Sequence, residues 1–181
     1  MSQKSNVRDV KGTKEPKHSE SQTQAGPEGP HFTIHNIYVK DISFEAPKVP
    51  HIFNDEWKPK LDFDLQMNSE PLPNDLYDVT VHLTLKVSLP EDKPAYLIEV
   101  QQAGVFSIKG FPQDILQKIL ATTCPEILFP YLRELISSLV ARGGFPQLML
   151  PPMNFEAMYA QYLTTKESKD QEGKTAEGQS T

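Results

Sequence analysis

The chain has 181 residues, a hydrophobic content of 38% and a formal net charge of -6. This length and composition suit one folded domain with solvated ends. The acidic balance excludes a typical nucleic-acid binder, which needs a surplus of Lys and Arg on one face, and it favours a cationic partner instead.

The two ends of the chain contain almost no apolar residues. Residues 1–30 and 164–181 are dominated by Lys, Glu, Ser, Gln and Gly. Segments of this composition cannot bury enough apolar surface to offset the entropy lost on ordering. The sequence therefore predicts a disordered N-terminal arm (1–30), one folded domain (31–163) and a disordered C-terminal tail (164–181).

Four segments alternate apolar and polar residues, which is the pattern of a strand with one dry face and one wet face. The first segment changes parity between Ile34 and Ile37, which predicts a bulge or bend. Short connections join the later segments, which favours an antiparallel meander after the long link at 46–59. The four predicted strands lie at 32–44, 60–67, 77–88 and 96–108.

The apolar spacing becomes helical after the fourth strand. A short helix is expected near Asp114, interrupted by Pro125, and a longer helix from about Ile127 to Gly143 with Pro130 in its first turn. Asn154 is the expected cap of a last helix. Four strands followed by helices predict an α+β fold in which the helices pack on a four-stranded antiparallel sheet.

The fourth predicted strand carries apolar residues on both faces. Ile98 and Val100 share one face, whereas Leu97 and Val105 share the other. We expect this surplus to be covered by a second subunit or by the helices of the same chain.

Cys124 is the only cysteine, so an intramolecular disulfide is excluded. The first ten residues lack the apolar run of a secretory signal, and no stretch reaches the ~18 apolar residues of a membrane-spanning helix. We therefore expect a cytoplasmic protein that does not insert into a membrane. Its apolar neighbours predict that Cys124 is buried and structural.

No residue pattern indicates an enzyme, a metal site or a cofactor. The five histidines lack zinc or iron spacing, and Asp62 and Asp64 fit a solvated strand face. Gly143 and Gly144 follow a helix and fit a C-terminal cap rather than a phosphate-binding loop.

Apolar residues outside the regular elements are the remaining candidates for binding. Flexible Met and aromatic side chains adapt to many partners, although such loops also fold onto their own core. The candidates are Val49, Ile52, Phe53, Trp57, Phe145, Leu148, Met149, Leu150 and Met153.

Several blocks of the sequence resemble the bacterial protein-export chaperone SecB, in the order in which that family carries them. They are IYVKDISFEAP (37–47), EVQQAGVFSI (99–108), CPEILFPY (124–131) and RGGFPQL (142–148), followed by Asn154 and Phe155. The resemblance spans about 31–163.

The resemblance implies an ATP-independent holdase that binds unfolded precursor proteins in the cytosol and delivers them to the SecA translocation motor. It also implies a homotetramer, a dimer of dimers with helices packed between two sheets. A client groove would lie between the 46–59 link and the last helix, where the apolar candidates fall. By position, the SecA contacts would be Asp41, Glu45, Leu97 and Glu99, and the residues that support subunit association would be Ile98, Val100 and Gln102.

Two features depart from the family pattern. The arm before His31 is longer than usual, and Ala103 stands where a second glycine is common. Two alternatives remain open: a SecB-like chaperone dedicated to one partner, such as an antitoxin, and a small-molecule-binding or enzymatic α+β domain that uses Cys124.

Overall fold

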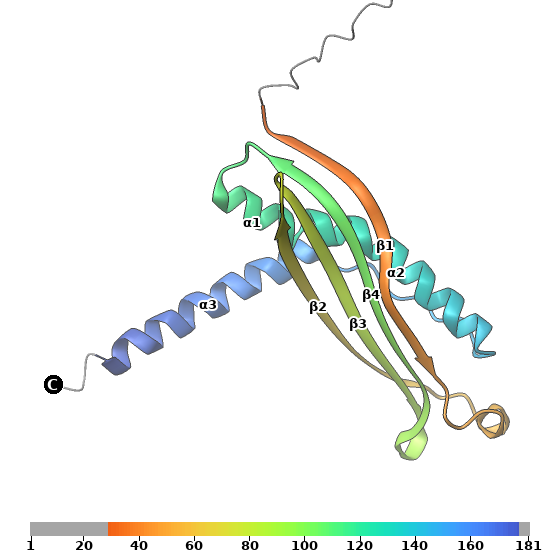
Figure 1. The fold of residues 1–181 in the computed structure, drawn as a ribbon. Helices are drawn as coiled ribbons and strands as arrows, with labels where there is room; N and C mark the ends of the chain where they lie inside the picture. Colours follow the sequence, from red (N-terminus) through yellow and green to blue (C-terminus); the bar gives the residue numbers. More distant parts are fainter. Residues whose placement is uncertain (1–28, 178–181) are drawn as a thin grey trace, which may run out of the picture.

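The computed structural model describes the backbone of residues 29–177 and the side chains of residues 29–166 (Figure 1). The predicted arm at 1–30 lies outside this range except for Gly29 and Pro30, and so do residues 178–181 of the predicted tail. The elements are β1 (His31–Glu45), β2 (Lys60–Leu72), β3 (Leu76–Leu89), β4 (Lys93–Lys109), α1 (Gln113–Ala121), α2 (Thr123–Arg142) and α3 (Phe155–Glu177), with single 3-10 turns at His51–Asn54 and Pro90–Asp92.

The four strands form one antiparallel sheet in the order β1-β4-β3-β2. Strands β2, β3 and β4 form the predicted meander. The crossover segment, residues 46–59, carries the chain from the end of β1 to the opposite edge of the sheet (Figure 1). The predicted α+β fold with helices on a four-stranded antiparallel sheet is confirmed, and β1 and β2 are its two edges.

One face of the sheet is covered by α2, which packs on β4 and β3. Alternation along β3 places Val79, Val81, Leu83, Leu85 and Val87 on this face, each at most 2% exposed. The helix contributes an apolar stripe at helical spacing. That stripe consists of Leu128, Leu132, Ile136 and Val140.

Two bulges explain the parity change in β1. The register with β4 shifts between Ile34 and Asn36 and again between Val39 and Asp41. Each extra residue returns the following apolar side chains to the helix-covered face. The predicted irregularity of the first strand is therefore confirmed, and it keeps one apolar face along the whole strand.

The break between the two central helices differs from the prediction. It lies at Thr122 (φ -123°, ψ -66°), and α2 begins four residues before the expected start at Ile127. Thr122 donates from both its backbone N–H and its hydroxyl to the carbonyl of Lys118, at 2.9 and 2.8 Å. Pro125 does not interrupt a helix, because it lies in the first turn of α2, where an N–H would have no partner. Pro130, expected in a first turn, lies inside the helix.

The last helix is longer than predicted. Asn154 caps it, since its Oδ1 accepts the N–H of Ala157 at 2.9 Å. The helix continues to Glu177, so residues 164–177, for which the sequence predicts disorder, are helical. The Lys, Glu and Gln residues of this segment have high helix propensity. Among the described residues, no helix is long and apolar enough to cross a membrane.

Gly104 should be essential for the packing of α2 on the sheet. A Cβ atom there would lie 3.0 Å from Leu128 Cδ2 and 3.1 Å from the carbonyl oxygen of Asn36. Gly104→Ala should lower the free energy of unfolding by about 1–3 kcal/mol, as overpacking does, measured by urea denaturation. Gly29→Ala is the control, because no atom lies within 4 Å of the added Cβ. Equal stability of the two variants would contradict this packing.

Candidate protein-binding surfaces

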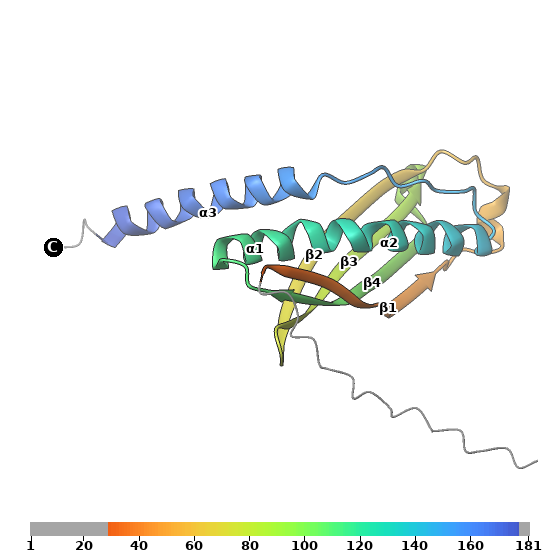
Figure 2. The ribbon, with the colours of Figure 1, turned by 90° about the horizontal axis from the view of Figure 1, so that it is seen from above.

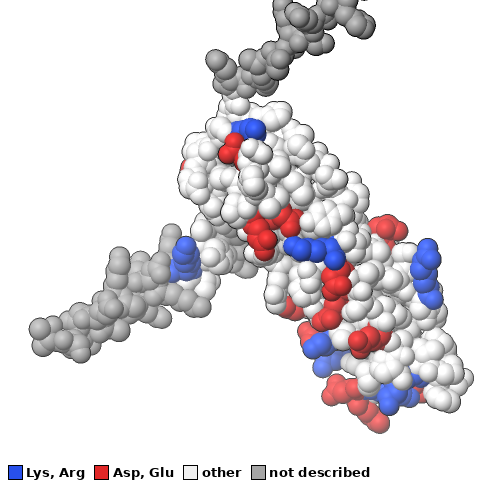
Figure 3. All heavy atoms as spheres, viewed as in Figure 1, with Lys and Arg blue, Asp and Glu red and all other residues white. Residues whose placement is uncertain are grey.

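The outer face of the sheet, opposite α2, carries a band of carboxylates. Figure 3 shows acidic side chains over this face with a few lysines between them. The register places Glu45 beside Leu97 and Asp62 beside Lys86, so the band reaches from β1 to β2. We define the acidic face as five exposed residues: Asp41, Glu45, Asp62, Asp64 and Glu99. The four predicted SecA contacts all lie on this side of the sheet.

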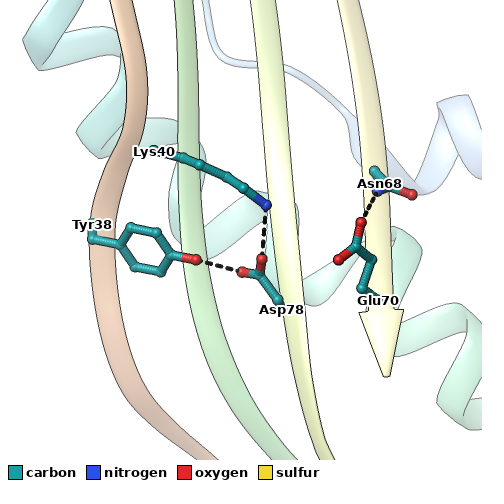
Figure 4. Close-up of polar contacts among 5 residues, drawn as sticks. All are labelled: Tyr38, Lys40, Asn68, Glu70 and Asp78. Atoms are coloured by element: carbon teal, nitrogen blue, oxygen red, sulfur yellow. Dashed lines mark hydrogen bonds and ion pairs between the residues drawn. The ribbon is translucent and has the colours of Figure 1, made fainter. Parts of the chain in front are cut away.

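Three side chains form a polar cluster on the same face (Figure 4). The Tyr38 hydroxyl donates to Asp78 Oδ1 at 2.8 Å, and Lys40 Nζ donates to Asp78 Oδ2 at 3.0 Å. Asp78 is only 9% exposed. The hydrogen bond to Asp78 and the charge of Asp78 raise the pKa of Lys40. Burial raises the pKa of Tyr38 most, and the hydrogen bond to Asp78 raises it further. Lys40 therefore pairs with Asp78 rather than with the neighbouring Asp41.

The cluster spans β4, which lies between β1 and β3. Tyr38 is opposite Ala103 on β4, and Ala103 is opposite Thr80 on β3. A methyl group at this position leaves room for the Tyr38 side chain to pass over β4. The residue that departs from the family pattern therefore lies beneath a contact between non-adjacent strands.

The predicted residues for subunit association lie on the opposite face. Ile98 and Val100 are fully buried and Gln102 is 3% exposed. The Gln102 side-chain amide donates to the carbonyl of Tyr38 at 2.9 Å. They share the face that α2 covers, so within one chain they belong to its core.

Open apolar surface lies instead on the two edge strands. Because α2 covers the central strands, side chains of the same face on β1 and β2 stay partly uncovered, at 38–47% exposure. Sequence periodicity placed these residues on a dry face but could not show that one helix is too narrow to cover them. They are Ile34, Val39 and Ile42 on β1 and Leu61, Phe63 and Met67 on β2.

The crossover segment ends in an aromatic cluster around Phe145. Its ring centroid lies 4.8 Å from that of Tyr96, 5.3 Å from that of Phe53 and 5.7 Å from that of Trp57. Phe145 is buried, whereas Phe53 is 48% exposed and forms the outer surface of the cluster. Gly144 (φ +81°) permits the turn, and a Cβ there would lie 3.3 Å from the Phe53 ring. The structure thus brings the crossover and Phe145 together.

The chain after Phe145 runs back alongside α2 toward α3 (Figure 2). Residues 147–150 and α2 enclose an open cavity of about 480 Å³, the α2 hollow, which Leu148, Met149 and Leu150 line. Met149 is 68% exposed. The nine predicted groove residues therefore divide between two regions. Val49 and the buried Ile52 belong to the crossover, and Met153 packs against the core between the α2 hollow and α3.

A second apolar hollow was missed by sequence reasoning. It has a volume of about 440 Å³ and lies between β2, α1 and α3, and we name it the β2 hollow. The signal was present, because the last helix carries an apolar stripe for which the sequence offered no packing partner. Its apolar lining includes Met67, Leu120, Met158 and Tyr162.

Cys124 is fully buried, and burial raises the pKa of its thiol from 9.0 to about 12. Within residues 29–166, no group of three or more His, Cys, Asp or Glu side chains could hold a metal ion. Among the described residues, carboxylates thus lie on one side of the sheet, and the two hollows lie on the other, the α2 hollow being lined also by Arg133 and Glu134.

The comparisons with known proteins agree with this arrangement. The family model described as preprotein translocase subunit SecB matches residues 25–166. The chain belongs to the SecB family. The protein-export protein SecB of Histophilus somni strain 2336 is 48% identical over 145 residues, covering 80% of this chain and 84% of that protein. The SecB of Pseudomonas syringae pv. tomato is 50% identical over 135 residues, covering 75% and 82%.

A solved structure shares the SecB fold. The SecB-like chaperone of Mycobacterium tuberculosis, in complex with a ChAD peptide from the HigA1 antitoxin, aligns with a TM-score of 0.55 and 19% identity. The alignment covers 68% of this chain and 91% of that one. The predicted role, a chaperone of protein export, is thus confirmed at the level of the SecB family.

The burial of Cys124 should make its thiol unreactive in the folded protein. Near pH 8 the thiolate is the reactive form, and a pKa of about 12 leaves very little of it. Labelling with a thiol reagent should be slow in the native protein and fast in guanidinium chloride. Rapid native labelling would support the enzymatic alternative.

The same burial should make stability depend on pH. Because the folded-state pKa of the Cys124 thiol is raised, the free energy of unfolding should fall as pH rises from about 9 toward 12.

Proposed function

We propose that the protein is an ATP-independent holdase that binds unfolded precursor proteins in the cytosol and delivers them to SecA. The observation that carries this proposal is the open apolar surface on the helix side of the sheet, at the β2 edge, the crossover and the two hollows. Membership of the SecB family supports it. The relatives at 48% and 50% identity are named for protein export, which favours export over a chaperone dedicated to one partner.

Client capture needs no folded partner. The outer edge of β2 has no neighbouring strand among the described residues, so its backbone N–H and C=O groups can pair with an extended segment. Leu61 and Phe63 supply apolar contact beside that edge, and Met67 links it to the β2 hollow. Met67 and Met149 are flexible enough to fit varied sequences. Several weak contacts along one client then add by avidity.

SecA would bind the acidic face. Glu45 lies opposite the half-buried Leu97, Glu99 follows two residues along β4, and Asp41 lies further along opposite Gln101, so an apolar side chain sits beside a row of carboxylates. Such a row steers a basic partner segment and mainly raises its association rate. Alternation along β4 puts this site and the client surface on opposite sides of the sheet. Client and motor could therefore occupy one chain at the same time.

The assembly would be a homotetramer, a dimer of dimers, with helices packed between two sheets. The open row on β1 (Ile34, Val39 and Ile42) and the 51% exposed Tyr131 on α2 are apolar surfaces that other copies would cover. Ile98, Val100 and Gln102 would support association indirectly, because they carry the helix that contacts the second dimer.

Removing apolar surface from the predicted groove should weaken client capture. Phe53→Asp and Met149→Asp each place a charge on an exposed apolar contact, and together they should lower the affinity for a urea-unfolded precursor about tenfold or more. Size-exclusion chromatography with light scattering measures the retained precursor. Ile115→Asp is the matched control, since Ile115 is exposed on α1 outside these regions. Unchanged affinity in the double variant would contradict the groove assignment.

Reversing charge on the acidic face should weaken SecA binding selectively. Asp41→Lys with Glu99→Lys should slow association with SecA by about tenfold at low salt and leave client capture unchanged. Asp114→Lys with Glu126→Lys is the charge-matched control, because both residues are exposed on the helices and line neither hollow. Surface plasmon resonance gives both rates. Parallel loss of SecA and client binding would indicate misfolding instead of a lost contact.

A further inference from the structure

The N-terminal segment has the opposite charge to the rest of the chain. Residues 4–17 contain five basic and two acidic residues, which gives a net charge of +3, whereas the whole chain carries -6. The basic residues recur every three or four positions, and the apolar content is limited to Val7 and Val10. They are Lys4, Arg8, Lys11, Lys14 and Lys17.

The acidic face has charge that the described part of the chain does not neutralise. No lysine or arginine within residues 29–166 forms an ion pair with any of its five carboxylates. Lys40 binds Asp78 and Lys60 lies 3.9 Å from Asp92, whereas Lys86, opposite Asp62 on the same face, forms no ion pair within 4.0 Å among the described residues. A basic segment on this face would therefore gain several charge contacts without displacing existing ones.

The segment is attached at the far end of the same sheet. Pro30 lies beside Gly110, just beyond the end of β4, where a Cβ on Gly110 would be 3.4 Å from Pro30 Cα. From His31, the strand β1 leads to Asp41 over ten residues, or about 33 Å. The root of the segment and two of the five acidic-face residues, Asp41 and Glu45, therefore lie along β1.

The length of the chain suffices to bridge this distance. Lys14 lies seventeen positions before His31 in the chain. A flexible polar chain of this length has a root-mean-square span of about 23 Å and can extend to roughly 57 Å. The local concentration of the basic segment at the acidic face is therefore on the order of millimolar.

We propose that the basic segment Lys4–Lys17 binds the acidic face of its own chain and acts as a tethered competitor of any basic partner that uses this face. The basic segment does not suit tight binding in the apolar hollows, because it has no aromatic residue and only two sizeable apolar side chains, Val7 and Val10. The contact itself is independent of the proposed function, whereas its effect on SecA rests on that function.

A paramagnetic label in the segment tests the contact. Thr13→Cys carries a nitroxide in the full-length chain, and the buried Cys124 leaves the new thiol as the site of reaction. Leu97 methyl groups report on the acidic face. Ile115 methyl groups lie on α1, five residues after Gly110, and report on the helix side near the root. We expect the Leu97 signal to fall at least twofold on labelling, and the Ile115 signal to change less.

A matched variant isolates the role of charge. Replacing the five basic residues by Gln, as in Lys11→Gln and Lys14→Gln, keeps length and label but removes the cations. The Leu97 signal should recover in this variant, and also in the original chain at about 0.5 M NaCl, where the screening length is about 4 Å. The proposal would be overturned if the Leu97 methyl signal fell equally in the original chain and in the Gln variant. It would also be overturned if the Ile115 signal fell more than the Leu97 signal.

Partner binding then separates the two proposals. SecA should associate about twofold to tenfold faster with the Gln variant than with the original chain, because the tethered competitor is gone. Slower association with the Gln variant would overturn the competition. If SecA binds neither form while the Leu97 effect persists, the proposed SecA site fails and the contact within the chain stands.

Discussion

The packing of one helix on a four-stranded sheet sets most properties of this protein. An α-helix with side chains is about 10 Å wide, whereas four strands spaced at about 4.8 Å span more than 14 Å between the outer strand axes. The helix α2 therefore covers β3 and β4 and leaves the apolar rows of β1 and β2 partly open. Gly104 keeps the helix close to the sheet, so that this coverage is tight where it exists. Uncovered apolar surface is thus a result of geometry, and it is the surface that a holdase requires.

The two-residue period of the strands gives the sheet two sides of different chemistry. Neighbouring residues of β4 alternate between the core and the acidic face, as Ile98 and Glu99 show. A change of charge on the outer side can therefore leave the apolar side intact. The acidic side is kept negative by local pairing, because Lys40 is held by Asp78.

The sequence was sufficient to predict the features that depend on local pattern. Alternation identified all four strands, the parity change in β1 indicated its bulges, and Asn154 marked the start of α3. The family resemblance indicated the function class. The start of α2 was misjudged because a proline is tolerated throughout the first turn, so Pro125 could not by itself distinguish a helix break from a helix start.

The positions of the hollows could not be predicted, because they depend on how elements distant in sequence pack together. Alternation places Met67 on the dry face of the 60–67 strand, and Met158 lies in the last helix, but their meeting across the β2 hollow depends on the path of residues 143–154. The division of the groove residues between two regions has the same origin. Phe53, in the 46–59 crossover, packs on Phe145, whereas Met149, in the segment after Phe145, lines the hollow beside α2.

The contact of Tyr38 and Lys40 with Asp78 has a mechanical consequence. Backbone hydrogen bonds alone would let an edge strand separate from its neighbour one pair at a time. Here β1 is also fastened to β3 by side chains that pass over Ala103, so peeling β1 must break contacts to two strands together. If a motor draws the bound chain away, as proposed for SecA, the sheet would experience such forces. The cluster would resist them at one edge, while β2, which has no such fastening among the described residues, remains the compliant edge of the sheet.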